Sequence, residues 1–154
     1  MNRTLVALLL AAVAIPASAH PAAAQRGTPT EAKALLQKAV QHYLAVGRLQ
    51  ALADFTGKKA PFVYRDLYVF CIGPNRIISA NGGFPAFVGT SVEALRDAEG
   101  KPLGSAIWDI AATKGQGSVQ YRWINPVSGK TEPKISFFQK VGNDVCGVGA
   151  YKPR

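Results

Sequence analysis

Three side chains close together in the sequence could hold an anion: Tyr121, Trp123 and Lys134. A lysine ammonium attracts a carboxylate, while phenol and indole groups each present a hydrogen-bond donor on a large apolar ring. Positions two apart in a strand share one face, so Tyr121 and Trp123 are expected to point the same way. Together the three residue types predict an anion-binding wall rather than a reacting centre.

These side chains belong to two strand-like runs within residues 119–139. Apolar and polar residues alternate on either side of residues 125–129, which contain the turn-forming pairs Asn-Pro and Ser-Gly. This pattern predicts an antiparallel hairpin. On its returning strand Lys134, Ser136 and Phe138 share one face, and that face can meet Tyr121 and Trp123.

Phe138 indicates that the shared face looks toward the protein interior, which would partly desolvate Lys134. A buried ammonium is costly unless it finds an anion or its long stem reaches water. We therefore expect Lys134 to be the main charged contact for a ligand carboxylate. The alternative is an internal ion pair with Asp66, Asp109 or Glu132.

A long amphipathic helix is predicted at the start of the folded region. Thr28 is placed as its N-cap, Pro29 takes the first helical position, and Glu31 can close a capping box. Apolar residues then recur at helical spacing, and Gly47 ends the helix. A shorter second helix is expected over residues 48–55.

Strands account for most of the remaining chain. Runs of β-branched and aromatic residues predict strands, and one further run has apolar residues at helical spacing. The expected strands outside the hairpin are 62–64, 67–72, 76–80 and 145–151, a single helical turn is expected at 91–95, a polar turn at 97–101, and a helix at 103–111. This order is an α+β plan in which helices cover one face of a meandering antiparallel sheet.

Residues 81–90 are expected to form a loop. Asn81 is followed by two glycines, which favour a plain turn over a close backbone approach to a ligand. Phe84 and Phe87 are expected to fold inward from this loop.

Residues 1–24 are predicted to be a secretory signal peptide. Arg3 gives a positive start, residues 5–15 form an unbroken apolar run, and small residues offer cleavage after Ala19 or Ala24. The run is too short for a membrane span, and nothing after it is long or apolar enough to be one. We expect a periplasmic or secreted protein that does not span the membrane after cleavage, with residues 28–154 as one domain.

The formal net charge of +9 invites a nucleic-acid interpretation. The basic residues are scattered and no recognition motif accompanies them, so nucleic acid is not expected as a partner. A solvated basic surface is favoured over attraction to anionic ligands or an anionic envelope. No Cys/His cluster has zinc spacing, since His20 either leaves with the signal peptide or lies at the frayed start of the mature chain, and His42 stands alone in a helix. Neither a metal nor a cofactor is therefore expected.

Two cysteines, Cys71 and Cys146, lie in strand-like segments. An exported protein passes through an oxidising compartment, so a disulfide between them is chemically permitted. Two buried free thiols are the alternative.

Seven short motifs resemble, in order and spacing, the single Cache domain of type 2, an extracytoplasmic sensor module with a PAS-like fold. The resemblance covers residues 31–152. The motifs are Asp66-Leu-Tyr-Val-Phe70, Asp97-x-x-Gly-Lys101, Gly115-x-Gly117, Tyr121-x-Trp123-x-Asn125-Pro126, Gly129-Lys130, Pro133-Lys134 and Gly147-x-Gly149-x-Tyr151.

The resemblance implies a long N-terminal helix packed on a five- or six-stranded antiparallel sheet, with a pocket for a small organic acid or similar metabolite between the sheet and the loop-and-helix segment. The pocket residues it implies are Tyr68, Phe70, Asn81, Tyr121, Trp123 and Lys134. The glycine-rich stretch after Asn81 departs from the family pattern. In a PAS-like strand order the first and last strands are neighbours, so a Cys71–Cys146 disulfide is predicted, with Cα atoms within about 7 Å.

Cache domains usually sit in membrane-anchored transducers, and this sequence departs from that pattern because it shows neither an anchor after the signal nor an output domain. We therefore expect a free periplasmic binding module that captures a small acid and presents it to a separate membrane receptor or transporter. A non-catalytic interaction module without a ligand is the alternative, and its opening helix could support a weak homodimer. An enzyme is not expected. A small hydrolase or isomerase using Lys134, Tyr121 or Asp109 lacks a recognisable Ser-His-Asp, Cys-His or paired-carboxylate arrangement.

Overall fold

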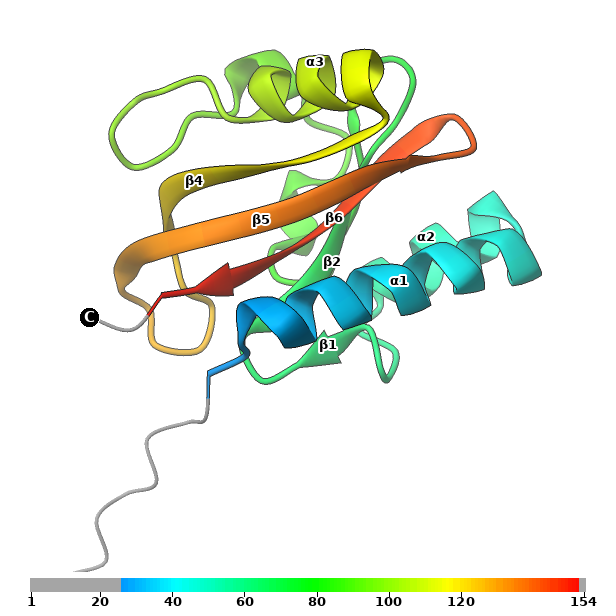
Figure 1. Cartoon of the computed structure of the whole chain (residues 1–154), viewed down its shortest axis with the longest axis horizontal. Helices are drawn as coiled ribbons and strands as arrows, with labels where there is room; N and C mark the ends of the chain where they lie inside the picture. Colours follow the sequence, from blue (N-terminus) through cyan, green and yellow to red (C-terminus); the bar gives the residue numbers. More distant parts are fainter. Residues whose placement is uncertain (1–25, 153–154) are drawn as a thin grey trace, which may run out of the picture.

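A computed structural model describes residues 26–152 of the chain as one mixed α+β unit (Figure 1). The predicted signal peptide with both cleavage sites, and His20, lie outside the described residues. The helices are α1 (Pro29–Val46), α2 (Arg48–Thr56) and α3 (Gly104–Lys114), with short 3-10 turns η1 (Pro85–Phe87) and η2 (Val92–Ala94). None of the described helices is both long enough and apolar enough to cross a membrane.

Six antiparallel strands form the sheet, in the order β1-β2-β6-β5-β4, and β3 pairs with the same strand β2 as β1 does. Their bounds are β1 (Val63–Tyr64), β2 (Leu67–Ile72), β3 (Ile78–Asn81), β4 (Gln116–Ile124), β5 (Thr131–Val141) and β6 (Asp144–Tyr151). The first long strand and the last therefore lie side by side. The predicted fold class, a long helix on a PAS-like antiparallel sheet, is confirmed.

The opening helix starts as the sequence predicts. Thr28 Oγ1 accepts from the Glu31 backbone N–H at 3.1 Å, and Glu31 Oε2 accepts from the Thr28 backbone N–H at 2.8 Å. This reciprocal capping box satisfies two donors that the first helical turn would otherwise leave free. Gly47, at φ 83°, separates α1 from α2.

Helices cover both faces of the sheet, whereas the sequence pattern placed them on one. In Figure 1, α1 and α2 lie against one face and α3 against the other. The reason lies in β5, where Phe137 packs into the core under α1 and the adjacent Phe138 packs into the core under α3. A strand with large apolar side chains on both faces needs cover on both.

The closing strand β6 is buried along its whole length. Two of its glycines leave room for side chains from neighbouring strands. A Cβ atom at Gly147 would lie 2.5 Å from Cζ of Phe70, and one at Gly149 would overlap the stem of Lys134. These glycines therefore let Phe70 and Lys134 lie flat across the sheet.

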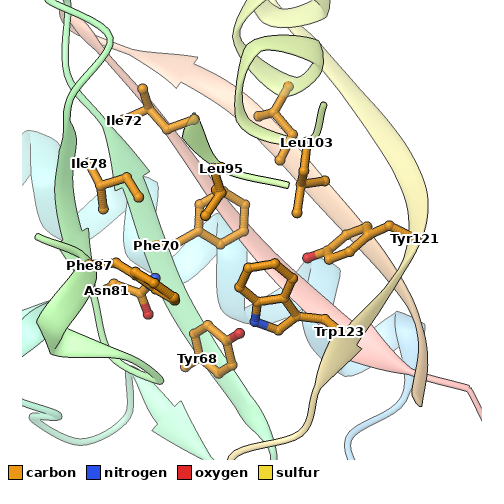
Figure 2. Close-up of a pocket in the computed structure, with 11 residues that line it drawn as sticks. Tyr68, Phe70, Ile72, Ile78, Asn81, Phe87, Leu95, Leu103, Tyr121 and Trp123 are labelled. Atoms are coloured by element: carbon orange, nitrogen blue, oxygen red, sulfur yellow. The ribbon is translucent and has the colours of Figure 1, made fainter. Parts of the chain in front are cut away.

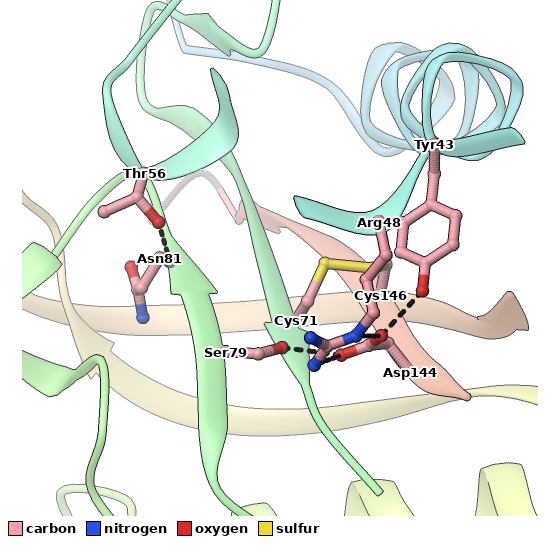
Figure 3. The surroundings of a disulfide bond; sticks show 8 residues. All are labelled: Tyr43, Arg48, Thr56, Cys71, Ser79, Asn81, Asp144 and Cys146. Carbon is pink, nitrogen blue, oxygen red and sulfur yellow. Dashed lines mark hydrogen bonds and ion pairs between the residues drawn. A yellow bond between two sulfur atoms is a disulfide. The ribbon is translucent and has the colours of Figure 1, made fainter. Parts of the chain in front are cut away.

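A disulfide joins β2 to β6, where Cys71 and Cys146 are direct partners in the strand register (Figure 3). Their Cα atoms are 4.1 Å apart, and both residues are buried. The pairing follows from the strand order, because adjacent antiparallel strands bring two facing positions this close.

Beside the disulfide, the fully buried Asp144 is surrounded by donors (Figure 3). It accepts from Tyr43 Oη at 2.7 Å, from Arg48 Nε at 2.6 Å and from Ser79 Oγ at 2.8 Å. Burial and the hydrogen bond to Asp144 raise the pKa of Tyr43 to about 12. The network ties α1, α2 and β3 to the start of β6.

Candidate functional site

A small cavity lies on the α3 side of the sheet, beneath η1 and η2. Its volume is about 40 Å³, room for about three water molecules. Figure 2 shows its lining, which comes from strands β2, β3 and β4 and from the segments that cover them: Tyr68, Phe70, Ile72, Ile78, Asn81, Phe87, Leu95, Leu103, Ile107, Tyr121 and Trp123.

The cavity has one polar end and one apolar end. The hydroxyls of Tyr68 and Tyr121 and the indole nitrogen of Trp123 gather on one side in Figure 2, while Ile72 and Leu103 lie on the other. The Tyr121 hydroxyl also lies 2.7 Å from Ser136 Oγ. Such a lining suits a ligand with a single polar head and a short apolar tail.

Lys134 lies one layer behind the polar end and does not line the cavity. Its side chain is 1% exposed, and Nζ is hydrogen-bonded to Tyr68 Oη at 2.8 Å and donates to Tyr151 Oη at 3.2 Å. Nζ also lies 4.0 Å and 4.4 Å from the centroids of the same two rings. Two phenols therefore enclose the amine.

The alternative role of Lys134, as one partner of an internal ion pair, is wrong. Among residues 26–152, Asp109 pairs with Arg76 at 3.1 Å, and Glu132 Oε1 accepts from Arg26 at 2.9 Å. Asp66 accepts from the Gly27 backbone and from Asn125. All three carboxylates that were possible partners of Lys134 therefore bond to other donors.

Burial without a counter-ion has a clear electrostatic effect on this amine. Desolvation pushes the pKa of Lys134 well below its usual 10.5, and the Asp66 charge opposes this only in part. Burial likewise raises the pKa of Tyr68, Tyr121 and Tyr151, so their hydroxyls keep their protons. The polar end of the cavity therefore offers hydrogen-bond donors and no fixed negative charge.

Asn81 closes another side of the cavity. Its Oδ1 accepts from the backbone N–H groups of Gly83 and Phe84 at 3.1 and 2.8 Å, which leaves its amide nitrogen for the cavity. A Cβ atom at Gly83 would lie 2.5 Å from the Tyr68 ring. The glycine pair thus serves the turn and its packing against Tyr68, in agreement with the favoured interpretation.

Two aromatic rings of the loop lie at the cavity: Phe87 lines it, and Phe84 packs against Phe87. Phe84 lies 5.8 Å from Tyr68 and 6.2 Å from Trp123, centroid to centroid, and Phe87 lies 6.0 Å from Trp123. Both rings are half-buried and fold inward as predicted. Distances of this size are typical of favourable aromatic pairs.

The structure brings five of the six predicted site residues to one cavity wall: Tyr68, Phe70, Asn81, Tyr121 and Trp123. Tyr151 and Ser136, which bond Lys134 and Tyr121 behind the polar end, were not among the predicted site residues. Alternation along β6 could have found Tyr151, because it shares a face with Gly147 and Gly149. The apolar end comes from several separate segments and leaves no local signal.

A larger hollow of about 430 Å³ lies beside α1, lined by Leu35, Tyr64 and Leu67 among others. Its charged lining residues, Glu31 and Lys38, are not buried, whereas Tyr68 and Asn81 in the smaller cavity are. The smaller cavity is therefore the better ligand site. Within the described part of the chain no group of three or more His, Cys, Asp or Glu side chains could hold a metal ion. His42 instead bonds Asp54 at 2.7 Å.

Comparisons with known proteins agree with this architecture. The sequence model of the single Cache domain 2 family matches residues 7–150. The comparison with curated proteins gives no match.

Three solved structures share the fold, each with a TM-score of 0.65. A methyl-accepting chemotaxis protein from Vibrio parahaemolyticus RIMD 2210633 is 20% identical, and the match covers 79% of this chain and 86% of that chain. A Cache chemosensory domain described for its recognition of carboxylic acids is 19% identical, with 80% and 92% covered. A periplasmic sensor domain of a chemotaxis protein is 25% identical, with 79% and 92% covered.

Proposed function

Because the chain belongs to the single Cache domain 2 family, we propose that its cavity binds a small monocarboxylic acid as the first step of sensing outside the cytoplasm. Domains of this family are extracytoplasmic, non-catalytic ligand-sensing modules, and the resemblance found in the sequence is confirmed. Membership of the family does not specify the acid, the compartment or the partner that responds to the bound state, and these are proposed below.

The observation that carries the proposal is the division of the cavity into a polar and an apolar end. A carboxylate can accept from the hydroxyls of Tyr68 and Tyr121 and from the amide of Asn81, while its alkyl tail meets Ile72 and Leu103. A second charged head, as in a dicarboxylate or an amino acid, would be buried against that apolar end without partners. One structural relative is described for carboxylic acid recognition, which supports the same class.

The small size of the cavity restricts the class of acids that can bind. A cavity of about 40 Å³ admits only a few heavy atoms unless the covering rings move. Acetate and propionate fit this description, and longer acids require Phe84 and Phe87 to shift outward. We propose a periplasmic location, and a separate membrane receptor or transporter as the partner of the occupied domain.

Thermal unfolding of the purified protein tests the proposal. Acetate or propionate at a hundredfold excess over Kd should stabilise the fold by about 2.7 kcal/mol, whereas succinate and alanine should not. Tyr121→Phe should weaken acid binding by about 1 kcal/mol, the value of one hydrogen bond. Tyr64→Phe, at an exposed tyrosine of β1, is the matched control. Equal shifts with all four compounds, or none with any, would refute the proposal.

Self-association is a second candidate role, because two leucines at the junction of α1 and α2 are strongly exposed. Leu44 is 70% exposed and Leu49 80%, and burying them between two copies would be favourable by about 1.5–3 kcal/mol per side chain. Sedimentation should then show a weak dimer that Leu44→Asn abolishes. A monomer at all concentrations in both proteins would rule out this role.

A further inference from the structure

The hydrogen bonds around Lys134 can be arranged in two ways that differ by one proton. Tyr151 Oη donates its only proton to the Ile124 carbonyl at 2.6 Å, so toward Lys134 it can only accept. Tyr68 Oη lies 2.8 Å from Nζ, and its proton has two possible directions. The charge on the amine therefore decides where the Tyr68 proton points.

A neutral amine has two N–H donors and one lone pair, whereas an ammonium has three donors and no acceptor. In the neutral form, the lone pair of Lys134 accepts the Tyr68 O–H while one N–H donates to Tyr151. In the charged form, Nζ donates to both phenols, and the Tyr68 O–H must turn away from the lysine. Tyr68 lines the cavity, so this freed donor is available to a carboxylate there.

We propose that a carboxylate entering the cavity is bound together with one proton. Lys134 takes this proton up from solvent, and the Tyr68 O–H then turns toward the cavity and donates to the carboxylate. The inference rests on the proposed function and adds how the site is regulated: affinity for the acid falls as pH rises. No covalent bond forms. The process adds one anion and one proton, so the buried site gains no net charge.

The charged groups packed around Lys134 explain why the ligand is needed. Asp66, from the β1–β2 turn, is held by Gly27 and Asn125, and Glu132 of the same strand β5 is paired with Arg26. The remaining titratable neighbours are the hydroxyls of Tyr68 on β2, Tyr121 on β4 and Tyr151 on β6, all of them protonated. The surroundings thus supply too little negative charge to keep the amine charged.

A carboxylate in the cavity changes this balance. Behind the single layer of the Tyr68 side chain, its negative charge acts on Lys134 in a poorly solvated environment, where charges interact far more strongly than in water. An opposite charge at such close range favours the protonated amine. The neutral form in the empty site and the charged form in the filled site follow from the same geometry.

One competing explanation gives the same pH dependence. The ligand itself could bind as the undissociated acid, in which case the proton would sit on its carboxyl group and Lys134 would stay neutral. The two explanations differ in what happens when the lysine is removed. Lys134→Met keeps the length of the side chain, so a proton taken up by the ligand would survive this change, and a proton taken up by Lys134 would not.

Calorimetric titration of acetate and propionate into the protein, at one pH in phosphate and in Tris buffer, measures the protons taken up. The parent protein should take up about one proton per acid, and its affinity should fall about tenfold for each pH unit over the range where the free amine is neutral. Lys134→Met should bind about 10- to 100-fold more weakly, because the positive charge that attracts the carboxylate is lost, and should take up no proton. Lys140→Met, at an exposed lysine of the same strand, should behave like the parent.

A second measurement needs no variant. The Cε carbon of Lys134, followed by NMR in the parent protein, should shift from the position of a neutral amine to that of an ammonium when acetate is added. Binding without proton uptake, uptake that persists in Lys134→Met, or a Cε signal that does not change would each overturn the inference and leave the proposed function standing. Absence of binding by any acid would overturn both.

Discussion

Two buried ionisable side chains, Asp144 and Lys134, sit at opposite ends of the sheet and are treated in opposite ways. Asp144 is fully buried and receives hydrogen bonds from Tyr43, Arg48 and Ser79. Lys134 is also buried, and within residues 26–152 the hydrogen-bond partners of its amine are only the phenols of Tyr68 and Tyr151. A buried charge with a full set of partners holds elements together. A buried base without a counter-ion remains ready to change its charge.

Removing the carboxylate should have the largest effect. Asp144→Ala leaves Arg48 and Tyr43 without their acceptor, and breaking a buried pair costs about 3–5 kcal/mol. Urea unfolding should show this loss. The matched change Asp109→Ala removes an exposed ion pair with Arg76 and should cost less than about 1 kcal/mol. Equal losses in the two variants would contradict the structural role given to Asp144.

Removing the disulfide should come next. It joins residues 75 positions apart, and loss of a native disulfide typically costs about 2–4 kcal/mol. The double variant Cys71→Ala/Cys146→Ala should therefore unfold at lower urea while binding acetate normally, because both cysteines lie in the core under α1, on the face of the sheet opposite the cavity. The parent protein, denatured without reductant, should expose no thiol to alkylation. Two alkylated thiols would disprove the bond.

Replacing the unpaired base should act in the opposite direction. Lys134→Met exchanges a desolvated amine for an apolar side chain of similar length. We expect this change to stabilise the empty protein by about 1–3 kcal/mol, because the parent must give up the proton of Lys134 in order to fold. Acetate binding should weaken at the same time. A variant as unstable as Asp144→Ala would mean that Lys134 is a structural partner like Asp144.

The same variant predicts a pH effect of defined sign. The pKa of Lys134 is lowered in the folded state, so between that value and 10.5 the unfolded chain binds more protons. Stability of the parent protein should therefore rise with pH through this window, by up to about 1.4 kcal/mol per pH unit. Lys134→Met should lack this rise. A parent and variant with parallel pH profiles would show that Lys134 titrates normally when the site is empty.

Local patterns were sufficient to predict most elements of the fold. The capping box at Thr28 and Glu31 and the hairpin within residues 119–139 depend on neighbours a few positions away, and both are present as predicted. Alternation also placed Lys134 and Phe138 correctly on the inner face of β5.

Partners distant in sequence could not be predicted in the same way. Tyr68 lies 66 positions from Lys134, and three acidic residues seemed equally available to the lysine until their own donors were known. Asp144 directly follows Gly142 and Asn143, two residues that favour turns. Its burial depends on Arg48, 96 positions earlier, so no local pattern could separate a solvated turn aspartate from the centre of a network.

We expect Phe87, which lines the cavity, and Phe84, which packs against it, to limit how quickly the cavity fills. Because the cavity measures only about 40 Å³, a ligand can make few contacts in it before the loop moves. Association then becomes a two-step event, and its observed rate should level off at high acid concentration, where loop opening rather than encounter is limiting. Occupancy follows changes in concentration that are slower than this opening and averages those that are faster. Rapid fluctuations of the acid concentration should therefore leave the occupancy of the domain unchanged.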